Sequence, residues 1–249
     1  MFNNVSMLKT YENDTSQKRI PCPVQGKMRN NHLLLAVLVI VSMFVSSTIL
    51  LPNVMASEIW QQTYGGPNDE RAYSLVQTID GGYALAGFTY YVDSETADFY
   101  LVKTTEQGNL EWNKTYGGTS SDYARSLVQT SDGGYALAGA TESFGAGSDD
   151  FWLVKTDANG NMMWNQTYGG TDYDDAYSLV QTSDGGYALA GRTDSFGAGQ
   201  FDFWLVKTDA NGNMMWNQTY GGTERDWAFS MVQTSDCLLY TSPSPRDRS

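Results

Sequence analysis

Apolar and polar positions alternate along the chain in short runs, and the whole pattern returns every 52 residues without an insertion or deletion. Within one unit, four runs have strand composition, and each is bounded by residues that favour turns. The four runs are 124–130 (ARSLVQT), 135–141 (YALAGAT), 150–156 (DFWLVKT) and 162–168 (MMWNQTY). The pattern predicts a four-stranded antiparallel meander in each unit.

The connections between these runs carry turn chemistry. Ser-Asp-Gly-Gly at 131–134 and Asp-Ala-Asn-Gly-Asn at 157–161 are predicted hairpins, because glycine and the Asn-Gly pair supply the positive φ of tight turns. A longer loop at 142–149 joins the second run to the third, and Gly169-Gly170 begins the crossing to the next unit. In an up-and-down meander, the two hairpins lie at one end of the strands and the other two connections at the opposite end.

The period of the repeat predicts the fold class. Each unit is too small to bury a core of its own, so successive units are expected to stack. The tryptophans follow this period at Trp60, Trp112, Trp164 and Trp216. Four strands in about 40–50 residues is the range of a propeller blade. We therefore expect an all-β β-propeller of four-stranded antiparallel blades over 57–236.

Two motifs in the repeat resemble known propeller families. The Gly-Gly doublets followed by an aromatic residue resemble kelch repeats, and 157–161 ahead of Trp164 resembles the Asp-Ala-x-Thr-Gly-x-x-x-Trp docking motif of quinoprotein-type propellers. Asn159 stands where the threonine of that motif would be. The resemblance implies blades arranged around a central axis. A β-solenoid is the rival architecture, but its coils are shorter and have fewer tight hairpins.

The outermost repeats are predicted to be partial blades. Residues 58–64 (EIWQQTY) repeat the fourth run without the first three, and 228–234 begins a further unit. Between them lie three whole units, which is fewer than the usual minimum of four blades. We expect an incomplete ring, in which the strands that would complete the first fragment lie beyond the break in the repeat.

The N-terminal segment 1–56 reads as a cytoplasmic leader and export signal. An apolar run at 33–51 follows Lys27 and Arg29 and precedes a small-residue exit that ends at Ala56. The run is longer than an ordinary signal core and close to the length that spans a bilayer, so a cleaved signal peptide and a membrane anchor both stay open. Either reading places the repeats outside the cell, secreted or at the cell surface.

The C-terminal segment 237–249 departs from the repeat. After Asp236 the pattern requires Gly-Gly-Tyr-Ala-Leu, but the chain continues Cys-Leu-Leu-Tyr-Thr-Ser-Pro-Ser-Pro-Arg-Asp-Arg-Ser. These residues resemble the translation of a sequencing-library adapter. We therefore expect 237–249 to be a non-native tail on a truncated reading frame.

Composition narrows the chemistry of the repeats. Between 57 and 236 the chain has 8 basic and 25 acidic residues, a net charge near −17 that makes nucleic-acid binding improbable. His32, Cys22 and Cys237 all lie outside that range. A catalytic triad that uses His or Cys, a zinc site of these residues and a disulfide framework are thereby excluded from the repeats. We expect no catalytic residue, no required cofactor, and membrane contact only through the N-terminal apolar segment.

The two most similar units locate the variable surface. Segments 126–177 and 178–229 match at 44 of 52 positions. The eight differences are Ala140/Arg192, Glu142/Asp194, Ser148/Gln200, Asp149/Phe201, Asp172/Glu224, Tyr173/Arg225, Asp175/Trp227 and Tyr177/Phe229. All lie in or beside the two connections opposite the hairpins, and we call that side of the molecule the variable face. Variable loops on a repeated scaffold are the usual construction of a binding surface.

Three sets of candidate site residues follow. The predicted ligand-binding residues are Asp149, Asp172, Tyr173, Asp175, Arg192, Phe201, Arg225 and Trp227. Weak calcium candidates, chosen because carboxylates suit this ion, are Asp149, Asp172, Asp174 and Asp175; the same aspartates also serve as turn caps and solubilising charge. Asparagines of Asn-x-Thr sequons, and hence glycosylation candidates, are Asn113, Asn165 and Asn217.

Three functions stay open at this point. The export signal, the missing His and Cys and the localised variation favour a non-catalytic propeller that binds an extracellular protein or glycan. A quinoprotein-like or glycan-cleaving enzyme is the first alternative; it would use paired carboxylates such as Asp149 and Asp175, or an active site in the missing blades. A structural envelope protein, in which the repeats serve as spacers, is the second alternative.

Overall fold

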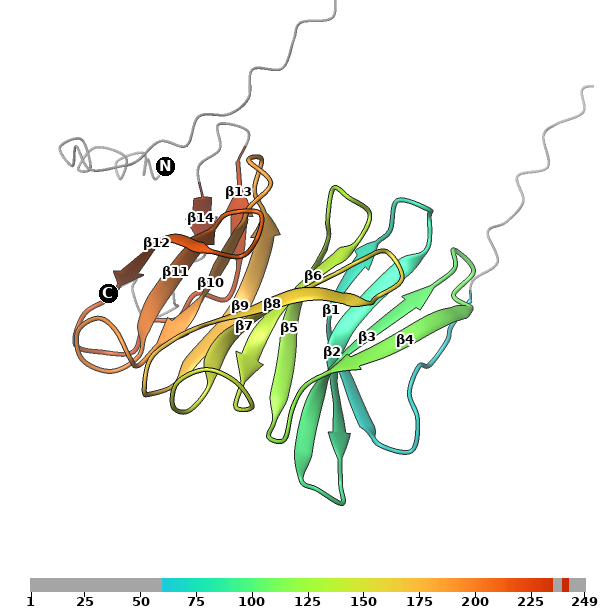
Figure 1. Ribbon diagram of the computed structural model, residues 1–249, viewed down its shortest axis with the longest axis horizontal. Coiled ribbons are helices and arrows are strands. Elements are labelled where there is room, and N and C mark those ends of the chain that lie inside the picture. Colours follow the sequence, from blue (N-terminus) through green and yellow to red (C-terminus); the bar gives the residue numbers. More distant parts are fainter. Residues whose placement is uncertain (1–59, 235–238, 242–249) are drawn as a thin grey trace, which may run out of the picture.

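Three four-stranded antiparallel sheets follow one another along the chain in the computed structural model, which describes residues 60–234 and 239–241 (Figure 1). The first sheet contains β1 (Asp69–Gln77), β2 (Tyr83–Tyr91), β3 (Thr96–Thr104) and β4 (Leu110–Tyr116). The second contains β5 (Asp122–Gln129), β6 (Tyr135–Thr141), β7 (Asp150–Thr156) and β8 (Met162–Tyr168). The third contains β9 (Asp174–Gln181), β10 (Tyr187–Thr193), β11 (Asp202–Thr208) and β12 (Met214–Tyr220). Each sheet is an up-and-down meander, as the alternation predicts.

The predicted strands are confirmed, and the bounds of β6, β7 and β8 agree residue by residue. The first strand of this unit begins earlier than predicted, at Asp122, because this residue pairs with Thr141 at the end of β6. Both predicted hairpins form. Gly133 and Gly160 have φ of 84° and 74°, a backbone conformation that glycine adopts without strain.

The core lies between successive sheets. At the first junction, small and apolar side chains of the first sheet pack against aromatic and aliphatic side chains of the second. This junction contains Ala84, Ala86, Phe99 and Leu101 on one side and Leu127, Tyr135, Leu137, Trp152 and Val154 on the other. The second junction repeats the arrangement one period later. The alanines of the second strand explain how the sheets approach closely, because they put little volume between them.

A tryptophan of the first sheet docks on the second hairpin of the second sheet, and Trp164 docks in the same way on the third sheet. The ring of Trp112 lies where a Cβ on Gly160 would stand, so that only glycine fits there. The hydroxyl of Tyr116 donates a hydrogen bond of 2.7 Å to the carbonyl of Gly160. The three units are consistent with propeller blades. A closed ring stays a prediction.

The predicted fourth strand at 58–64 is wrong for the residues that the structure describes, because 60–66 form no strand. The segment still docks as its counterparts do: Trp60 packs against Gly108 and Tyr83, and the Tyr64 hydroxyl donates to the Gly108 carbonyl at 2.6 Å. An outer strand needs a third strand beside it for its ladder of hydrogen bonds, and no such neighbour precedes it within 60–234.

The partial unit at the C-terminal side contributes less strand than predicted. Of 228–234, only β13 (Met231–Gln233) is a strand, and it pairs with β14 (Leu239–Thr241). Ala228, Met231 and Leu239 pack against the third sheet. Domain boundaries at 56 and 236 stay predictions.

The predicted leader, with its apolar run at 33–51, lies outside the described residues. Within the described residues, no helix has the length and apolar character needed to cross a membrane.

Candidate functional site

The two variable connections meet at the same end of the sheets, as the meander predicts. The Asp174 amide donates a hydrogen bond of 2.7 Å to the Asp149 carbonyl, and the Asp226 amide donates one of the same length to the Phe201 carbonyl. The loop between the second and third strands of a unit therefore lies against the crossing to the next unit. Asp149 and Asp175, which a different topology would separate, lie at the same end.

A β-bulge in the first strand of each sheet shapes this face. In β5, Ala124 pairs with Gly139 and Ser126 with Ala138, so Arg125 is an extra residue without a partner in the ladder. Tyr73 in β1 and Tyr177 in β9 occupy the same position. A bulge redirects the side chain of the extra residue away from the regular alternation. One side chain in every unit is thereby released from the core.

The glycine of the second strand makes each bulge possible. A Cβ on Gly139 would stand 1.9 Å from the Tyr123 carbonyl oxygen, and a Cβ on Gly191 would stand 1.9 Å from that of Asp175. Any larger residue would collide with the backbone of the bulged strand. The glycine of the second strand is therefore required by this close approach.

The released side chains stack along the first strands of neighbouring sheets. The Arg125 guanidinium lies 6.0 Å from the ring centroid of Tyr73 and 5.1 Å from that of Tyr177, and Tyr177 lies 5.4 Å from Phe229. Phe229 is the residue of the same repeat position in the partial unit. Cations over aromatic faces are attracted by the ring quadrupole. These four residues form a continuous row across the three sheets and the partial unit.

Arg192 is the centre of a second group beside this row. Its Nε donates a hydrogen bond of 2.7 Å to Asp175, and its Nη2 makes an ion pair with the same carboxylate. The guanidinium lies 4.1 Å from the ring of Phe201 and 5.1 Å from that of Trp227. Trp227 in turn lies 5.6 Å from Phe229, which joins the group to the row.

We call the combined set the aromatic–arginine cluster. Its members are Tyr73, Arg125, Asp175, Tyr177, Arg192, Phe201, Arg225, Trp227 and Phe229. Arg225 belongs to it because its guanidinium lies 5.6 Å from the Phe201 ring, and its Nε donates to the Gln200 side chain at 2.6 Å.

Six of the eight predicted ligand-binding residues lie in or beside this cluster: Asp149, Asp175, Arg192, Phe201, Arg225 and Trp227. The other two do not join it. Asp172 and Tyr173 lie in the crossing after β8, and both side chains are exposed, that of Tyr173 to 48%. Whether any of the eight binds a ligand stays a prediction.

Asp149 is the carboxylate of this face with the most perturbed proton affinity. Burial, together with the charges of Asp175 and Glu142, raises the pKa of Asp149 to about 6, although Arg192 and Arg125 oppose the rise. Asp175 is only 2% exposed and is paired with Arg192. The two carboxylates thus have different environments, one raised in pKa and partly accessible, the other buried in an ion pair.

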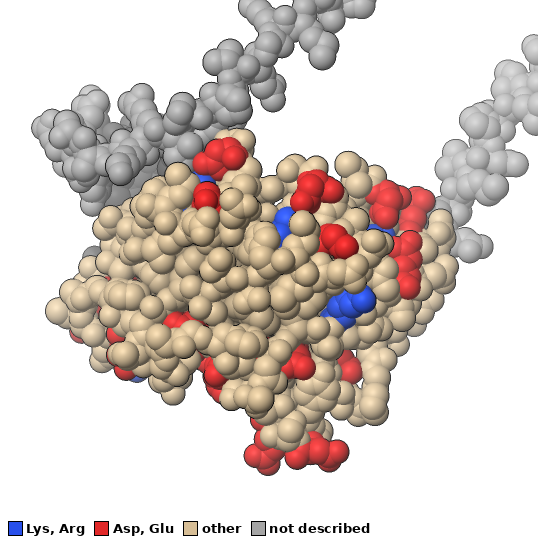
Figure 2. Space-filling view, in the orientation of Figure 1, with Lys and Arg blue, Asp and Glu red and all other residues tan. Residues whose placement is uncertain are grey.

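Seven of the eight basic residues in 60–234 divide between the two sides of the sheets, and the eighth, Lys114, lies on the outer strand β4. All four arginines in 60–234 lie within 6.0 Å of an aromatic ring on the variable face: Arg71 beside Phe88, and Arg125, Arg192 and Arg225 in the cluster. Lys103, Lys155 and Lys207 are instead buried at the hairpin side. Figure 2 shows how few basic side chains reach the visible surface among many acidic ones. The arginines are therefore concentrated where the sequence varies.

Several polar atoms of this face have no partner within the described residues. Arg125 Nε, Trp227 Nε1 and Asp149 Oδ1 are buried and make no hydrogen bond there. Buried polar atoms without a partner are uncommon and cost free energy. Two donors and one acceptor are thus unsatisfied on one face, next to aromatic rings.

The calcium candidates are not brought together. Asp174 and Asp175 are successive residues of β9, so their side chains point to opposite sides of the sheet. Asp174 accepts hydrogen bonds from the Gly170 amide and the Ser195 hydroxyl, whereas Asp175 is paired with Arg192. Asp172 is exposed in the crossing. Among the described residues, no group of three or more His, Cys, Asp or Glu side chains is placed to hold a metal ion.

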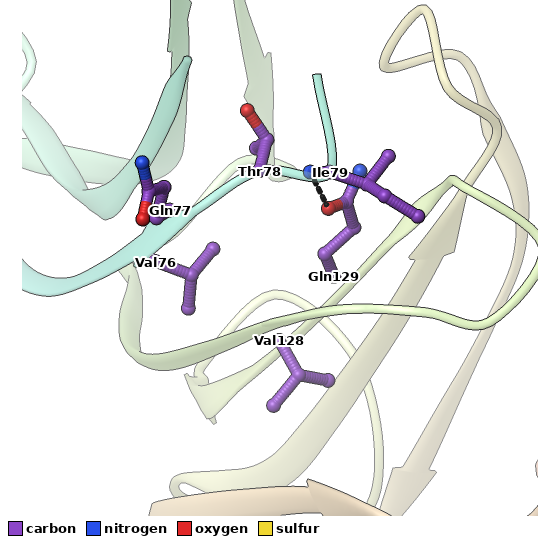
Figure 3. Close-up of a pocket in the computed structure, with 6 residues that line it drawn as sticks. All are labelled: Val76, Gln77, Thr78, Ile79, Val128 and Gln129. Carbon is purple, nitrogen blue, oxygen red and sulfur yellow. Dashed lines mark hydrogen bonds between the residues drawn. The ribbon is translucent and has the colours of Figure 1, made fainter. Parts of the chain in front are cut away.

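A pocket lies away from the cluster, between the first strands of the first two sheets (Figure 3). Its lining residues are Val76, Gln77, Thr78, Ile79, Val128 and Gln129. The Gln129 side chain accepts a hydrogen bond of 2.8 Å from the Ile79 amide, and the Thr78 hydroxyl donates to Asp80. The same glutamine contact joins Ser131 to Gln181 in the next pair of sheets. The pocket therefore lies at the repeated contact between neighbouring sheets.

Sequence reasoning missed the bulge position. Tyr73 and Arg125 were not among the predicted site residues, and Tyr177 appeared only as one difference between two units. A signal was present: across the four copies this position reads Tyr, Arg, Tyr and Phe, while the preceding Ala and the following Ser do not change. A varying bulky residue between two invariant small ones marks a side chain that the core does not constrain.

No known protein-family model matches the chain. The chain is 27% identical over 220 residues to the regulatory protein FlaEY of Caulobacter vibrioides, an alignment that covers 74% of this chain and 23% of that protein. A crystal structure of a protein of unknown function from Bacteroides caccae aligns with a TM-score of 0.44 and 12% identity, over 73% of this chain and 55% of that one. The chain thus spans less than a quarter of the length of FlaEY.

Proposed function

We propose that this chain is part of an exported, non-catalytic repeat protein that binds a protein or glycan partner through its variable face. The observation that supports the proposal most is the gathering of arginines and irregular aromatic residues on that face, in a chain that is otherwise strongly acidic. Tyr, Trp and Arg are the residues that dominate the binding energy of protein interfaces.

The bulge side chains and the unsatisfied polar atoms of the variable face also favour binding. The side chains of the bulge position contribute little to the cores between sheets, so their variation does not endanger the fold. Arg125 Nε, Trp227 Nε1 and Asp149 Oδ1 are buried without partners, so a rearrangement of these side chains on binding would let them gain hydrogen bonds from a polar ligand. The name of the bacterial relative, a regulatory protein, agrees with an activity that consists of binding.

The test compares exposed residues on two surfaces of the full chain. Arg225→Ala and Tyr173→Ala change the variable face, while Met163→Ala and Met215→Ala change equally exposed positions on the outer strands. Cross-linking to cell-surface extracts and a glycan array measure ligand capture, and circular dichroism checks the fold. We expect the first pair to lose about ten-fold or more in affinity for the captured ligand and the second pair to be unchanged. Equal loss in both pairs contradicts the proposal.

One observation favours a second candidate function, a glycan-cleaving enzyme. The raised pKa of Asp149, about 6, is that of a general acid, and Asp175, which is paired with Arg192, is a second carboxylate nearby. Asp175 is, however, bound by Arg192 and almost inaccessible, which makes binding the better supported function. Release of reducing sugar from soluble polysaccharides, abolished in Asp149→Asn and retained in Asp172→Asn, would favour the enzyme instead.

Export is tested separately from binding. If the N-terminal segment 1–56 directs the repeats outside the cell, protease added to intact cells removes the repeats from full-length protein. A variant with Asp substituted at two positions of the apolar run 33–51 should leave them protected. Protection of the unmodified chain from the protease would contradict export. The glycan array would still test the binding proposal.

A further inference from the structure

The three sequons occupy equivalent places on the outer strands. Asn113 pairs with Val102, Asn165 with Val154 and Asn217 with Val206, each on the last strand of its sheet. All three asparagines are exposed. Since the strand order ends at β4, β8 and β12, each sequon also lies on a strand with only one neighbour in its sheet. Backbone placement therefore does not distinguish the three sites.

Side-chain contacts do distinguish them. The Asn165 Oδ1 accepts a hydrogen bond of 3.1 Å from the indole nitrogen of Trp152, and its Nδ2 lies 3.4 Å from the sulfur of Met162. The Asn217 amide makes the same two contacts, at 3.2 Å to Trp204 and 3.2 Å to Met214. Both ends of each amide are thus engaged.

The first sheet lacks both partners. Tyr100 occupies the position of Trp152, and Leu110 occupies that of Met162. Tyrosine has no ring N–H to donate, and leucine has no sulfur. Within the described residues, no hydrogen bond engages the Asn113 side chain. Its amide is therefore free to turn, unlike those of Asn165 and Asn217.

We propose that Asn113 is the sequon asparagine that an N-glycosyltransferase modifies in the folded protein, and that Asn165 and Asn217 are withheld by their indole partners. The co-reactant is a sugar activated through a phosphate leaving group. The amide nitrogen attacks the anomeric carbon and a carbon–nitrogen bond forms. The bond from that carbon to the phosphate oxygen breaks and leaves its electron pair on the phosphate, and the nitrogen loses one proton to a base of the transferase.

The physical reason is the position of the amide during transfer. An amide nitrogen is a weak nucleophile because its lone pair is delocalised into the carbonyl, so a transferase has to grip and reorient the whole group. At Asn165 this would break the bond from Trp152, whose side chain is 1% exposed and whose N–H would be left buried without a partner. Leaving a buried donor unsatisfied carries its full desolvation penalty. At Asn113 no such bond is lost.

The experiment uses the folded full chain, a soluble N-glycosyltransferase that recognises Asn-x-Thr, and its nucleotide-activated sugar. Peptide mass spectrometry measures the modified fraction at each sequon after a short incubation. We expect Asn113 to exceed Asn165 and Asn217 by about ten-fold, the factor that one hydrogen bond of ordinary net strength corresponds to. Equal occupancy at the three sites would overturn the proposal.

Two exchanges make the test specific. Tyr100→Trp combined with Leu110→Met gives the first sheet the contacts of the second, and should lower occupancy at Asn113 to the level of Asn165. Trp152→Tyr should raise occupancy at Asn165. Trp152 lies in the core, so this variant could fail to fold; the Tyr100→Trp and Leu110→Met exchange in the first sheet then still tests the proposal. Unchanged occupancy at Asn113 in the exchanged first sheet contradicts the proposal.

A denatured control separates structure from local sequence. The first sequon reads Asn-Lys-Thr and the other two Asn-Gln-Thr, so the transferase could prefer the first for its middle residue. When the chain is unfolded in denaturant that the enzyme tolerates, or supplied as three synthetic peptides, we expect similar occupancy at all sites. A preference for Asn113 that persists there would overturn the structural explanation.

Discussion

The hairpin side and the variable face of the same sheets are built on opposite plans. At the hairpin side, each sheet buries one lysine that pairs with the aspartate of the Asp-Gly-Gly hairpin and donates to a backbone carbonyl, as Lys207 does to Asp184 and Thr208. The pairs Lys103–Asp80 and Lys155–Asp132 repeat this with distances of 2.9 Å. At the variable face, the side chains at the bulge position differ from sheet to sheet, and so do the contacts that they make. Repetition thus marks where the fold is held, and its loss marks where the surface is free to change.

The two sides also respond oppositely to protons. The Thr78 hydroxyl and Lys103 lower the pKa of Asp80 to about 2, and at Asp132 the bonds from Thr130 and Lys155 outweigh partial burial, with the same result. These carboxylates stabilise the fold above their unfolded pKa and lose that effect as the pH falls toward 2. On the variable face, Asp149 has a raised pKa, so its contribution is full in acid and lost as the pH rises through about 6.

The largest effect is expected from removing a bulge. Gly191→Ala would place a Cβ 1.9 Å from the Asp175 carbonyl oxygen, so the strands must separate or the bulge must disappear. We expect a loss of about 2–4 kcal/mol in the free energy of unfolding, measured by chemical denaturation. Gly222→Ala is the control, because nothing lies within 4 Å of its Cβ position. Equal stability of the two variants would show that the close approach is not what requires glycine.

The next effect tests the hairpin side. Lys207→Met keeps most of the side-chain volume but removes the ion pair of Asp184 and the side-chain donor of the Thr208 carbonyl, in a site where the lysine is 0% exposed. We expect a loss of about 2–3 kcal/mol by chemical denaturation. Lys114→Met on the outer strand should change stability by no more than about 0.5 kcal/mol. A neutral result at Lys207 would mean that the repeated pair is dispensable.

The pH dependence sharpens the comparison further. In Asp149→Asn, the carboxylate whose pKa burial raises to about 6 is gone, so the variant should gain stability over the wild type as the pH rises from about 4 to 7. After allowance for its partial exposure, the gain is roughly 1–2 kcal/mol at pH 7. Denaturation curves at several pH values measure it. Asp172→Asn, at an exposed site, is the control, and parallel curves for all three proteins would contradict the assignment.

The smallest effect on stability is expected on the variable face itself. Arg225→Ala removes an exposed hydrogen bond to Gln200 and a contact with the Phe201 ring. The change in unfolding free energy should stay within about 0.5 kcal/mol, because exposed contacts of this kind contribute little. A thermal melt monitored by circular dichroism checks this. A loss comparable to that of Lys207→Met would mean that the variable face holds the fold as much as the hairpin side does.

Sequence reasoning succeeded where local chemistry decides the outcome. The bounds of β6, β7 and β8 follow from alternation and from glycine in the turns, and the approach of Asp149 to the crossing after β8 follows from the meander. Sequence reasoning failed where the local structure depends on an adjacent strand. Residues 60–66 have the composition of an outer strand but lack a third strand to pair with. The bulge at Arg125 requires the backbone of β5 to approach β6 closely, which is possible only because residue 139 of β6 is glycine.

The same reasoning explains the misjudged aspartates. Asp172, Asp174 and Asp175 are close in sequence, which suggested an oxygen-rich cluster. Pleating sends Asp174 and Asp175 to opposite sides of β9, one into the loop contacts of Ser195 and the other toward Arg192. Proximity along a strand is therefore a poor guide to a shared site, since only alternate residues share a side.

The bulge gives this architecture a way to diversify. A new copy of the unit inherits the strand pairing and the buried lysine–aspartate ion pair. It also inherits the bulge position, whose side chain takes part in neither. Mutation there substitutes tyrosine, arginine or phenylalanine on the variable face while the cores between the sheets are copied unchanged. A gene that grows by duplication can in this way give nearly identical modules an individual binding surface, one residue per module. A combinatorial library at Tyr73, Arg125, Tyr177 and Phe229 would sample the same freedom in the laboratory.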